Sequence, residues 1–136
     1  MSTVSAKYLG DLRVECVHNQ SGIKIITDAP CDNQGKGNAF SPTDLCATAL
    51  GTCAMTIVGI YAKNHDLDVT GTEVEITKIM SDDPRRIDRI EVVFKMPPRV
   101  YSARDRASIE RCTTSCPVHL TLHPEVEQVF TFIWQD

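Results

Sequence analysis

The most continuous hydrophobic pattern in the chain lies between residues 41 and 63. A helix is predicted there because Ser41 supplies an N-cap, Pro42 takes the first helical position and Asp44 stands three residues after the cap. Apolar side chains then cover most of the helix circumference, which predicts packing on nearly every side. These side chains are Leu45, Cys46, Ala49, Leu50, Cys53, Ala54, Ile57, Val58 and Tyr61.

Shorter patterns before this helix predict strands. Residues 7–18 alternate between apolar and charged positions, which predicts one half-exposed strand. Ser21 and Gly22 favour a turn into a second strand at residues 23–27, so that the two strands form a hairpin. Residues 29–38 are rich in Gly, Pro, Asn and Asp and predict a loop that leads to the helix.

Strand patterns return after the helix. Residues 69–80 and 87–96 predict a second hairpin, whose turn at residues 81–84 has the residue types that turns favour. Residues 127–135 predict a last strand with three aromatic side chains on one face.

A second helix is predicted between these strands. Ser102 and Asp105 repeat the capping pattern, and the helix runs through about Ser115 before Pro117 terminates it. The predicted order of elements is strands, long helix, strands, helix and strand. This order favours an α+β domain with antiparallel pairing over an alternating doubly wound domain.

Composition narrows the class of protein. A chain of 136 residues with 42% hydrophobic content fits one domain, residues 1–136. The net charge of −4 and the scattered Lys and Arg leave no basic stripe for nucleic acid and no polybasic membrane anchor. We expect no export signal and no segment long enough to cross a bilayer, and hence a cytoplasmic protein with reduced cysteines.

The long apolar helix also predicts an oligomer. Five strands and one shorter helix are too few to bury so many apolar positions of the long helix. A second subunit is therefore expected to complete the burial, which makes the protein a homodimer.

The six cysteines are the candidate chemistry. Cys46 and Cys53 share a helix face but lie roughly 10 Å apart along the axis, too far for a disulfide. Cys112 and Cys116 are four positions apart, where a bridge within one helix is strained. A redox partner for Cys53 must therefore come from another element, and Cys116 is the better candidate because Pro117 ends the helix beside it.

A buried cysteine is more often a small packing residue than a nucleophile, and Cys16, Cys31, Cys46 and Cys112 are interpreted in that way. A thiol in the middle of a helix gains little from the helix dipole, so a reactive Cys53 needs a nearby cation.

Arg13 is the candidate for this cation, with Asp44 holding its guanidinium in a two-pronged pair. The alternatives are that Arg13 pairs on the surface with Glu15 or Asp11, and that Asp44 is a simple capping acid.

A metal site is a competing interpretation. Two thiolates and two imidazoles, from Cys112, Cys116, His119 and His123, would satisfy tetrahedral zinc. Pro117 interrupts any single helix that presents all four, and the spacing fits no common zinc finger. Zinc is the weaker interpretation, and neither a metal nor a cofactor is expected.

Three motifs together resemble the OsmC/Ohr family of thiol-dependent peroxidases. They are SPTDL at residues 41–45, ALGTC at residues 49–53 and CPV at residues 116–118. The resemblance extends to the order of the elements and covers nearly the whole chain. It implies antiparallel sheets wrapped around a long central helix, in an intertwined α+β homodimer with each active site at the subunit interface.

The resemblance also implies the chemistry. Cys53 would be the peroxidatic thiol at the bottom of an apolar pocket, and Cys116 the resolving thiol. The implied substrate is an organic hydroperoxide, and an external dithiol of the lipoyl or thioredoxin type would regenerate the pair. In the family an arginine activates the thiol and a glutamate orients that arginine.

The chain departs from the organic-hydroperoxide branch at this glutamate. Directly after Pro42 the sequence has Thr43, and the acid follows as Asp44, which is shorter and points about 100° away around the helix. Arg85 and Arg86 are alternatives to Arg13 as the activating cation. The rival to the peroxidase is a non-catalytic protein of the same fold, whose pocket binds a small apolar ligand and whose cysteines are structural.

Overall fold

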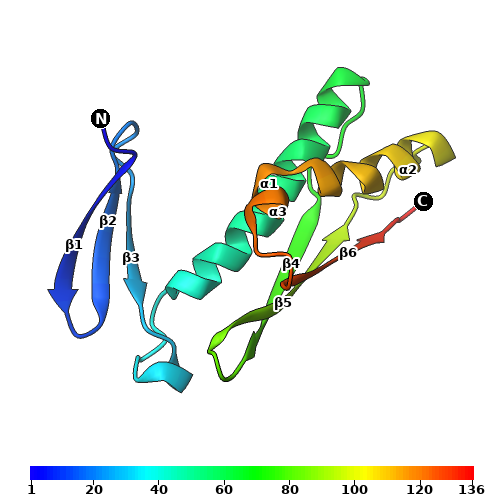
Figure 1. The fold of residues 1–136 in the computed structure, drawn as a ribbon. Coiled ribbons are helices and arrows are strands. Elements are labelled where there is room, and N and C mark those ends of the chain that lie inside the picture. Colours follow the sequence, from blue (N-terminus) through cyan, green and yellow to red (C-terminus); the bar gives the residue numbers. More distant parts are fainter. The chain divides into compact units, whose positions relative to one another are not determined.

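The computed structural model describes residues 1–136, which fall into two compact units, residues 1–46 and residues 47–136. The prediction of a single domain stays a prediction. Figure 1 labels the helices and strands of both units.

The first unit is built on a three-stranded antiparallel sheet. Its strands are β1 (Val4–Gly10), β2 (Arg13–His18) and β3 (Lys24–Asp28), in that order. The predicted turn before β3 is confirmed, because the His18 backbone N–H donates to the Ile23 carbonyl at 2.8 Å.

The prediction of one strand over residues 7–18 is wrong, because the chain reverses inside that range. Gly10, Asp11 and Leu12 have φ values of 86°, 52° and 63°, and the left-handed region they occupy is typical of tight turns. Tyr8 on β1 pairs with Val14 on β2, so both side chains lie on one face of the sheet. The apolar alternation therefore continues across the turn and conceals it.

The long helix α1 (Pro42–Asn64) begins where the sequence predicts. The Asp44 backbone N–H donates to Ser41 Oγ, and the Ser41 backbone N–H donates to Asp44 Oδ2, both at 3.0 Å. This reciprocal pair is a capping box, and it satisfies two donors that the first turn leaves without intrahelical partners. A short 3₁₀ turn, η1 (Cys31–Asn33), lies in the loop before it.

The second unit contains a mixed sheet in the order β4-β5-β6. β4 (Glu73–Ser81) and β5 (Arg86–Lys95) form the predicted hairpin. β6 (Glu127–Ile133) pairs with β5 in parallel, so the prediction of antiparallel pairing is wrong for this strand. The connection from β5 to β6 contains helices, and such a crossover can return the chain in the same direction.

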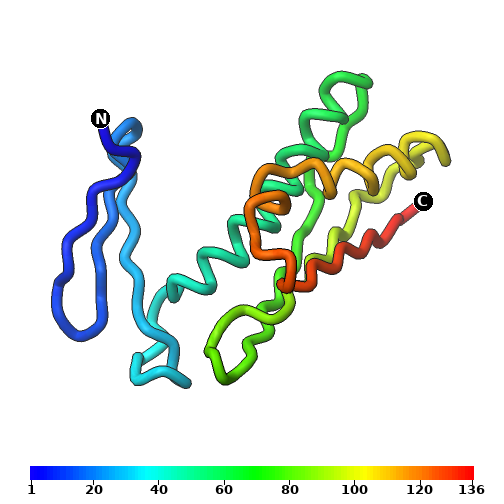
Figure 2. The backbone as a smooth tube through the Cα atoms, viewed as in Figure 1, coloured from blue at the N-terminus to red at the C-terminus, as the bar shows by residue number.

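That connection holds α2 (Ala103–Cys112), the 3₁₀ turn η2 (Thr113–Ser115) and α3 (Pro117–Thr121), as the tube in Figure 2 follows. The predicted cap of α2 is confirmed, because the Asp105 backbone N–H donates to Ser102 Oγ at 3.0 Å. The sequence pattern did not predict α3. Pro117 interrupts the preceding helix as predicted but also occupies the first position of α3, which its fixed φ suits.

In this unit the three helices pack on one face of the sheet (Figure 1). A Cβ added to Gly51 of α1 would lie 2.3 Å from Ile76 Cδ1 of β4, so the helix and the strand are in close contact. Trp134 Nε1 donates to Glu110 of α2 at 3.2 Å, and the His119 ring of α3 lies 6.1 Å from the Phe130 ring of β6. The core between the two layers includes Leu50, Ala54, Val58, Ile90, Val92, Phe94 and Ile109.

α1 is buried along one stripe rather than all around. The buried residues are Ala47, Leu50, Gly51, Ala54, Val58 and Ala62. Ile60 on another side of the helix is 51% exposed, so the predicted enclosure is incomplete in one chain. The expectation that no segment could cross a bilayer also fails, since α1 has the length and a mean hydropathy of 1.7. Core helices of soluble proteins pass the same test.

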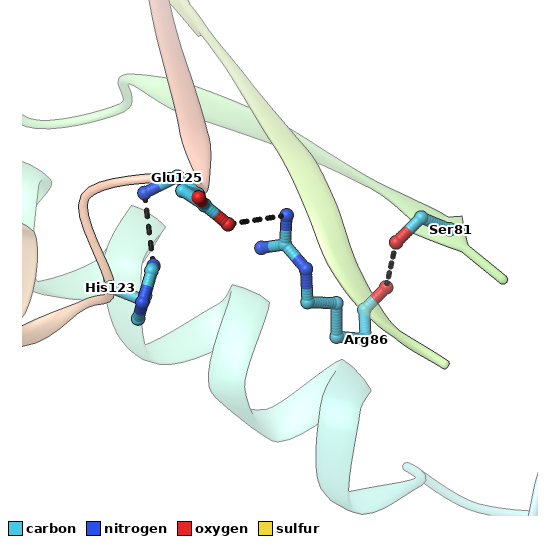
Figure 3. Close-up of polar contacts among 4 residues, drawn as sticks. All are labelled: Ser81, Arg86, His123 and Glu125. Carbon is cyan, nitrogen blue, oxygen red and sulfur yellow. Dashed lines mark hydrogen bonds and ion pairs between the residues drawn. The ribbon is translucent and has the colours of Figure 1, made fainter. Parts of the chain in front are cut away.

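Polar contacts connect the start of β5 to the end of β4 and to the segment before β6 (Figure 3). Arg86, at the start of β5, pairs with Glu125 at 3.3 Å, and the Glu125 backbone N–H donates to His123 Nδ1 at 3.1 Å. Ser81 Oγ, at the end of β4, donates to the Arg86 carbonyl at 3.4 Å. These contacts tie the segment before β6 to the β4–β5 hairpin.

Candidate active site

Cys53 lies at the start of the fourth turn of α1, half-buried beside a cavity of about 450 Å³. Residues of α1 at helical spacing form one wall, and the residues that follow Cys116 form the other. The lining residues are Ala49, Thr52, Cys53, Thr56, Ile57, Pro117 and Val118. The surface that they present is mostly apolar.

The cavity wall is apolar although it includes two threonines, because their hydroxyl groups are hydrogen-bonded within α1. Thr52 Oγ1 donates to the Thr48 carbonyl at 2.8 Å, and Thr56 Oγ1 donates to the Thr52 carbonyl at 2.7 Å. Each hydroxyl is therefore satisfied by its own helix one turn earlier. The cavity next to Cys53 suits the apolar part of a molecule better than a strongly hydrated one.

Cys116 is fully buried and stands at the N-cap of α3. Its Sγ accepts the His119 backbone N–H at 3.4 Å and also takes part in a hydrogen bond with the Cys53 side chain. Burial and, next, the bond with Cys53 raise the pKa of the Cys116 thiol above its ordinary value. At neutral pH Cys116 is therefore held as the protonated thiol.

The structure thus brings together the two cysteines that the sequence analysis singled out. Their parent elements differ as predicted, since Cys53 lies on α1 and Cys116 follows α2 and η2. Two thiols in hydrogen-bonding contact can be joined in a disulfide with little movement of the backbone.

Arg13 and Asp44 both lie in the first unit. Arg13 forms an ion pair with Asp28 at 3.8 Å, and the Asp28 side chain is only 1% exposed. The ion-pair partner of Arg13 is thus a buried aspartate and neither Glu15 nor Asp11. Asp44 accepts the Ser41 backbone N–H in the capping box. The predicted alignment of Arg13 by Asp44, and its action on Cys53, stay predictions.

The other four cysteines are also free thiols. Cys16, Cys46 and Cys112 are half-buried, and burial raises the pKa of the Cys112 thiol, partly offset by Arg111. These are properties of packing residues. Cys31 is exposed, so its assignment to packing is wrong, because it lies in the η1 turn rather than on a core-facing strand or helix.

The candidate zinc ligands do not assemble. No group of three or more His, Cys, Asp or Glu side chains is arranged to hold a metal ion. His119 Nδ1 instead lies 2.5 Å from Gln128 Oε1, and His123 Nδ1 accepts a backbone N–H. The contact with Gln128 could not be predicted from the sequence, because no motif joins β6 to α3.

Comparison with known proteins identifies the family. A family model for OsmC-like proteins matches residues 35–129. A crystal structure from Psychrobacter arcticus 273-4, provisionally named an osmotic stress induced and detoxification response protein, is 41% identical with a TM-score of 0.94. The match covers 98% of this chain and 96% of that one.

More distant structures share the fold. An OsmC-like protein from Mycoplasma pneumoniae is 16% identical with a TM-score of 0.78, over 98% of this chain and 96% of that one. An organic hydroperoxide resistance protein OsmC from Legionella pneumophila is 14% identical with a TM-score of 0.72, over 97% of each chain. No functionally curated protein sequence matches. The family model, which spans most of the chain, and the close structural relative show that this chain belongs to the OsmC-like family.

Proposed function

We propose that this protein is a thiol-dependent peroxidase that reduces organic hydroperoxides through Cys53 and Cys116. The observation that carries the proposal is the contact between these two thiols at the edge of an apolar cavity. The distant relative from Legionella pneumophila, named an organic hydroperoxide resistance protein, supports the same class of substrate.

The reaction begins at Cys53. Its thiolate attacks one peroxide oxygen of ROOH, the O–O bond breaks, and the products are a Cys53 sulfenic acid and, after protonation, the alcohol ROH. Cys116 then attacks the sulfenic sulfur, so that an S–S bond forms, the S–O bond breaks and water leaves with the thiol proton. An external dithiol of the lipoyl or thioredoxin type reduces this disulfide by exchange and is itself oxidised.

The cavity sets the preference for organic peroxides. Each buried methylene of an alkyl tail contributes about 0.8 kcal/mol of transfer free energy, a gain that hydrogen peroxide cannot obtain. The half-buried Cys53 sulfur borders this space, and Cys116 is more deeply buried. A peroxide in the cavity therefore meets Cys53 first.

Arg13 is proposed to stabilise the Cys53 thiolate and the developing alkoxide. A guanidinium carries five N–H donors, so the pair with Asp28 engages only part of its capacity. Asp44, fixed by the capping box, is proposed to orient this guanidinium in place of the family glutamate. The predicted outcome is that Arg13→Lys, which keeps the charge but loses the fork geometry, reacts more slowly than wild type.

We further propose that the protein acts as a cytoplasmic homodimer, with neither a cofactor nor a nucleic-acid partner. The exposed stripe of α1, with Ile60 half exposed, supports a second copy as the missing cover. Sedimentation at micromolar concentration tests this point, and a purely monomeric mass contradicts it.

Stopped-flow oxidation with an alkyl hydroperoxide tests the activity. Wild type and Cys116→Ser are expected to consume the first equivalent of peroxide at similar rates, whereas Cys53→Ser consumes none above background. Cys31→Ser, which removes an exposed thiol, is the matched control and should behave as wild type. Equal peroxide consumption by wild type and Cys53→Ser rejects the peroxidase.

The apolar cavity also supports one non-catalytic alternative, the binding of a small apolar ligand with structural cysteines. In that case an apolar fluorescent probe binds wild type and Cys53→Ser equally, and neither protein turns over peroxide. The two functions therefore give opposite results in the stopped-flow experiment.

A further inference from the structure

Gln128 connects the helix that carries Cys116 to the sheet. Its Nε2 donates to the His119 carbonyl at 3.2 Å, and its Oε1 lies 2.5 Å from His119 Nδ1. Gln128 is itself held in β6 opposite Ile90 of β5, which is fully buried. The two bonds therefore link α3 to the sheet, next to a fully buried position.

The direction of these bonds fixes the proton on His119. A carbonyl oxygen can only accept, so the Gln128 amide nitrogen must face the His119 carbonyl. The amide oxygen then faces the imidazole, and His119 Nδ1 must carry the hydrogen that it accepts. The side chain of Gln128 thus holds both the main chain and the ring of His119.

The helix α3 is short and only partly covered by the rest of the unit. It contains five residues, none of them buried, and Leu120 is 71% exposed. A helix this short is not stable by its own hydrogen bonds and depends on tertiary contacts for its position. His119 in turn donates its backbone N–H to Cys116 Sγ at 3.4 Å.

We propose that Gln128 is a positioning residue that holds Cys116 against Cys53 through His119. The contacts form a continuous path from the buried Ile90 of β5 through β6 and α3 to the sulfur pair. Gln128 touches neither sulfur, so its effect is on how readily the two sulfurs join. The redox role of this contact rests on the proposed function, whereas the positioning itself concerns only the stability of the disulfide.

Within the proposed cycle, Gln128 acts on the second step. The attack of Cys116 on the Cys53 sulfenic acid requires the two sulfurs to remain adjacent while water leaves. The first step involves only Cys53 and the peroxide. Loss of the Gln128 contacts is therefore expected to slow disulfide formation and to leave peroxide consumption in the first turnover unchanged.

A redox titration of the purified full chain in dithiothreitol buffers tests the positioning without any peroxide. Gln128→Met keeps the length of the side chain and removes both bonds. We expect it to lower the equilibrium constant for the Cys53–Cys116 disulfide about tenfold, which moves the midpoint about 30 mV to less negative potential. Gln20→Met, the same substitution in an exposed turn, should leave the midpoint unchanged.

A conservative variant separates hydrogen bonding from the imidazole itself. His119→Asn places an amide N–H near the position of Nδ1 and retains the main-chain carbonyl, so its midpoint should stay close to wild type. His119→Leu removes one of the two hydrogen bonds, so its redox midpoint should lie between those of wild type and Gln128→Met. If Gln128→Met is unfolded at the titration temperature, this series at His119 replaces it.

An unchanged midpoint in a folded Gln128→Met protein overturns the proposal, as does an equal shift in Gln20→Met. The same proteins are then mixed with one equivalent of alkyl hydroperoxide. The proposal predicts sulfenic acid that accumulates in Gln128→Met and not in wild type. If wild type forms the disulfide in the titration but does not react with peroxide, the proposed function fails while the positioning by Gln128 stands.

Discussion

The Cys116 thiol shares a hydrogen bond with the Cys53 side chain, although one residue lies inside α1 and the other caps α3. Burial and, to a lesser extent, this bond raise the pKa of Cys116. A thiol that stays protonated can donate to a neighbouring sulfur anion. Cys116 is therefore the member of the pair that is held as the protonated thiol.

Replacing Cys53 should move the titration of Cys116. In Cys53→Ala the hydrogen bond and the electrostatic interaction with Cys53 are gone, so the pKa of Cys116 falls, but burial keeps it above the ordinary thiol value. The pH dependence of Cys116 alkylation, followed by mass spectrometry, should shift to lower pH in the variant. Cys112→Ala is the control, and identical profiles for Cys53→Ala and wild type contradict the coupling.

Gly51 and Gly59 of α1 should respond in opposite ways to alanine. A Cβ at Gly51 would lie 2.3 and 2.7 Å from two Ile76 carbons, whereas Gly59 has nothing within 4 Å. We expect Gly51→Ala to destabilise the protein by about 1–3 kcal/mol through overpacking. Gly59→Ala should instead stabilise it by up to about 1 kcal/mol, since alanine favours helix interiors. Urea unfolding measures both, and equal effects would reject the close contact with β4.

The N-terminal cap of α1 should depend on the Ser41 hydroxyl. Ser41→Ala removes the acceptor for the Asp44 backbone N–H and should cost about 1 kcal/mol of unfolding free energy. Ser41→Gly, which also lacks the hydroxyl but suits the N-cap backbone, should cost only a few tenths of that amount. Chemical denaturation compares the two variants, and a larger loss for glycine than for alanine contradicts this account.

Asp68 should stabilise the fold in a pH-dependent way. Its Oδ1 accepts the Thr70 backbone N–H at 2.9 Å and its Oδ2 pairs with Arg99 at 3.0 Å. These contacts, with the Thr70 bond first, lower the pKa of Asp68. A lowered folded-state pKa gives stability that is present above the ordinary carboxyl pKa and is lost as the pH falls through the folded one.

Asp68→Asn should therefore lower the melting temperature at neutral pH. The difference from wild type should shrink as the pH falls from the ordinary carboxyl pKa of about 4 through the lower folded-state pKa, below which the carboxylate is protonated in both states. Melting curves across this range provide the measurement. A difference that does not depend on pH points to lost packing rather than to the charge.

Local signals in the sequence were enough to define most elements. The capping box at Ser41, the cap at Ser102 and the hairpin between β4 and β5 involve residues close in sequence, so their physics can be read without the fold. The turn at Gly10 was missed because the pairing of Tyr8 with Val14 preserves the alternation. The parallel pairing of β6 was missed because strand direction depends on the whole connection before it.

The same division holds for the site. Helical spacing excluded a bridge between Cys46 and Cys53 and directed attention to Cys116, since distances along a helix follow from the sequence alone. Only the tertiary structure brought Cys116 into contact with Cys53, gave Arg13 the buried Asp28 as partner and set Gln128 against His119. Each of these contacts joins separate elements, and packing among many side chains decides which of them meet.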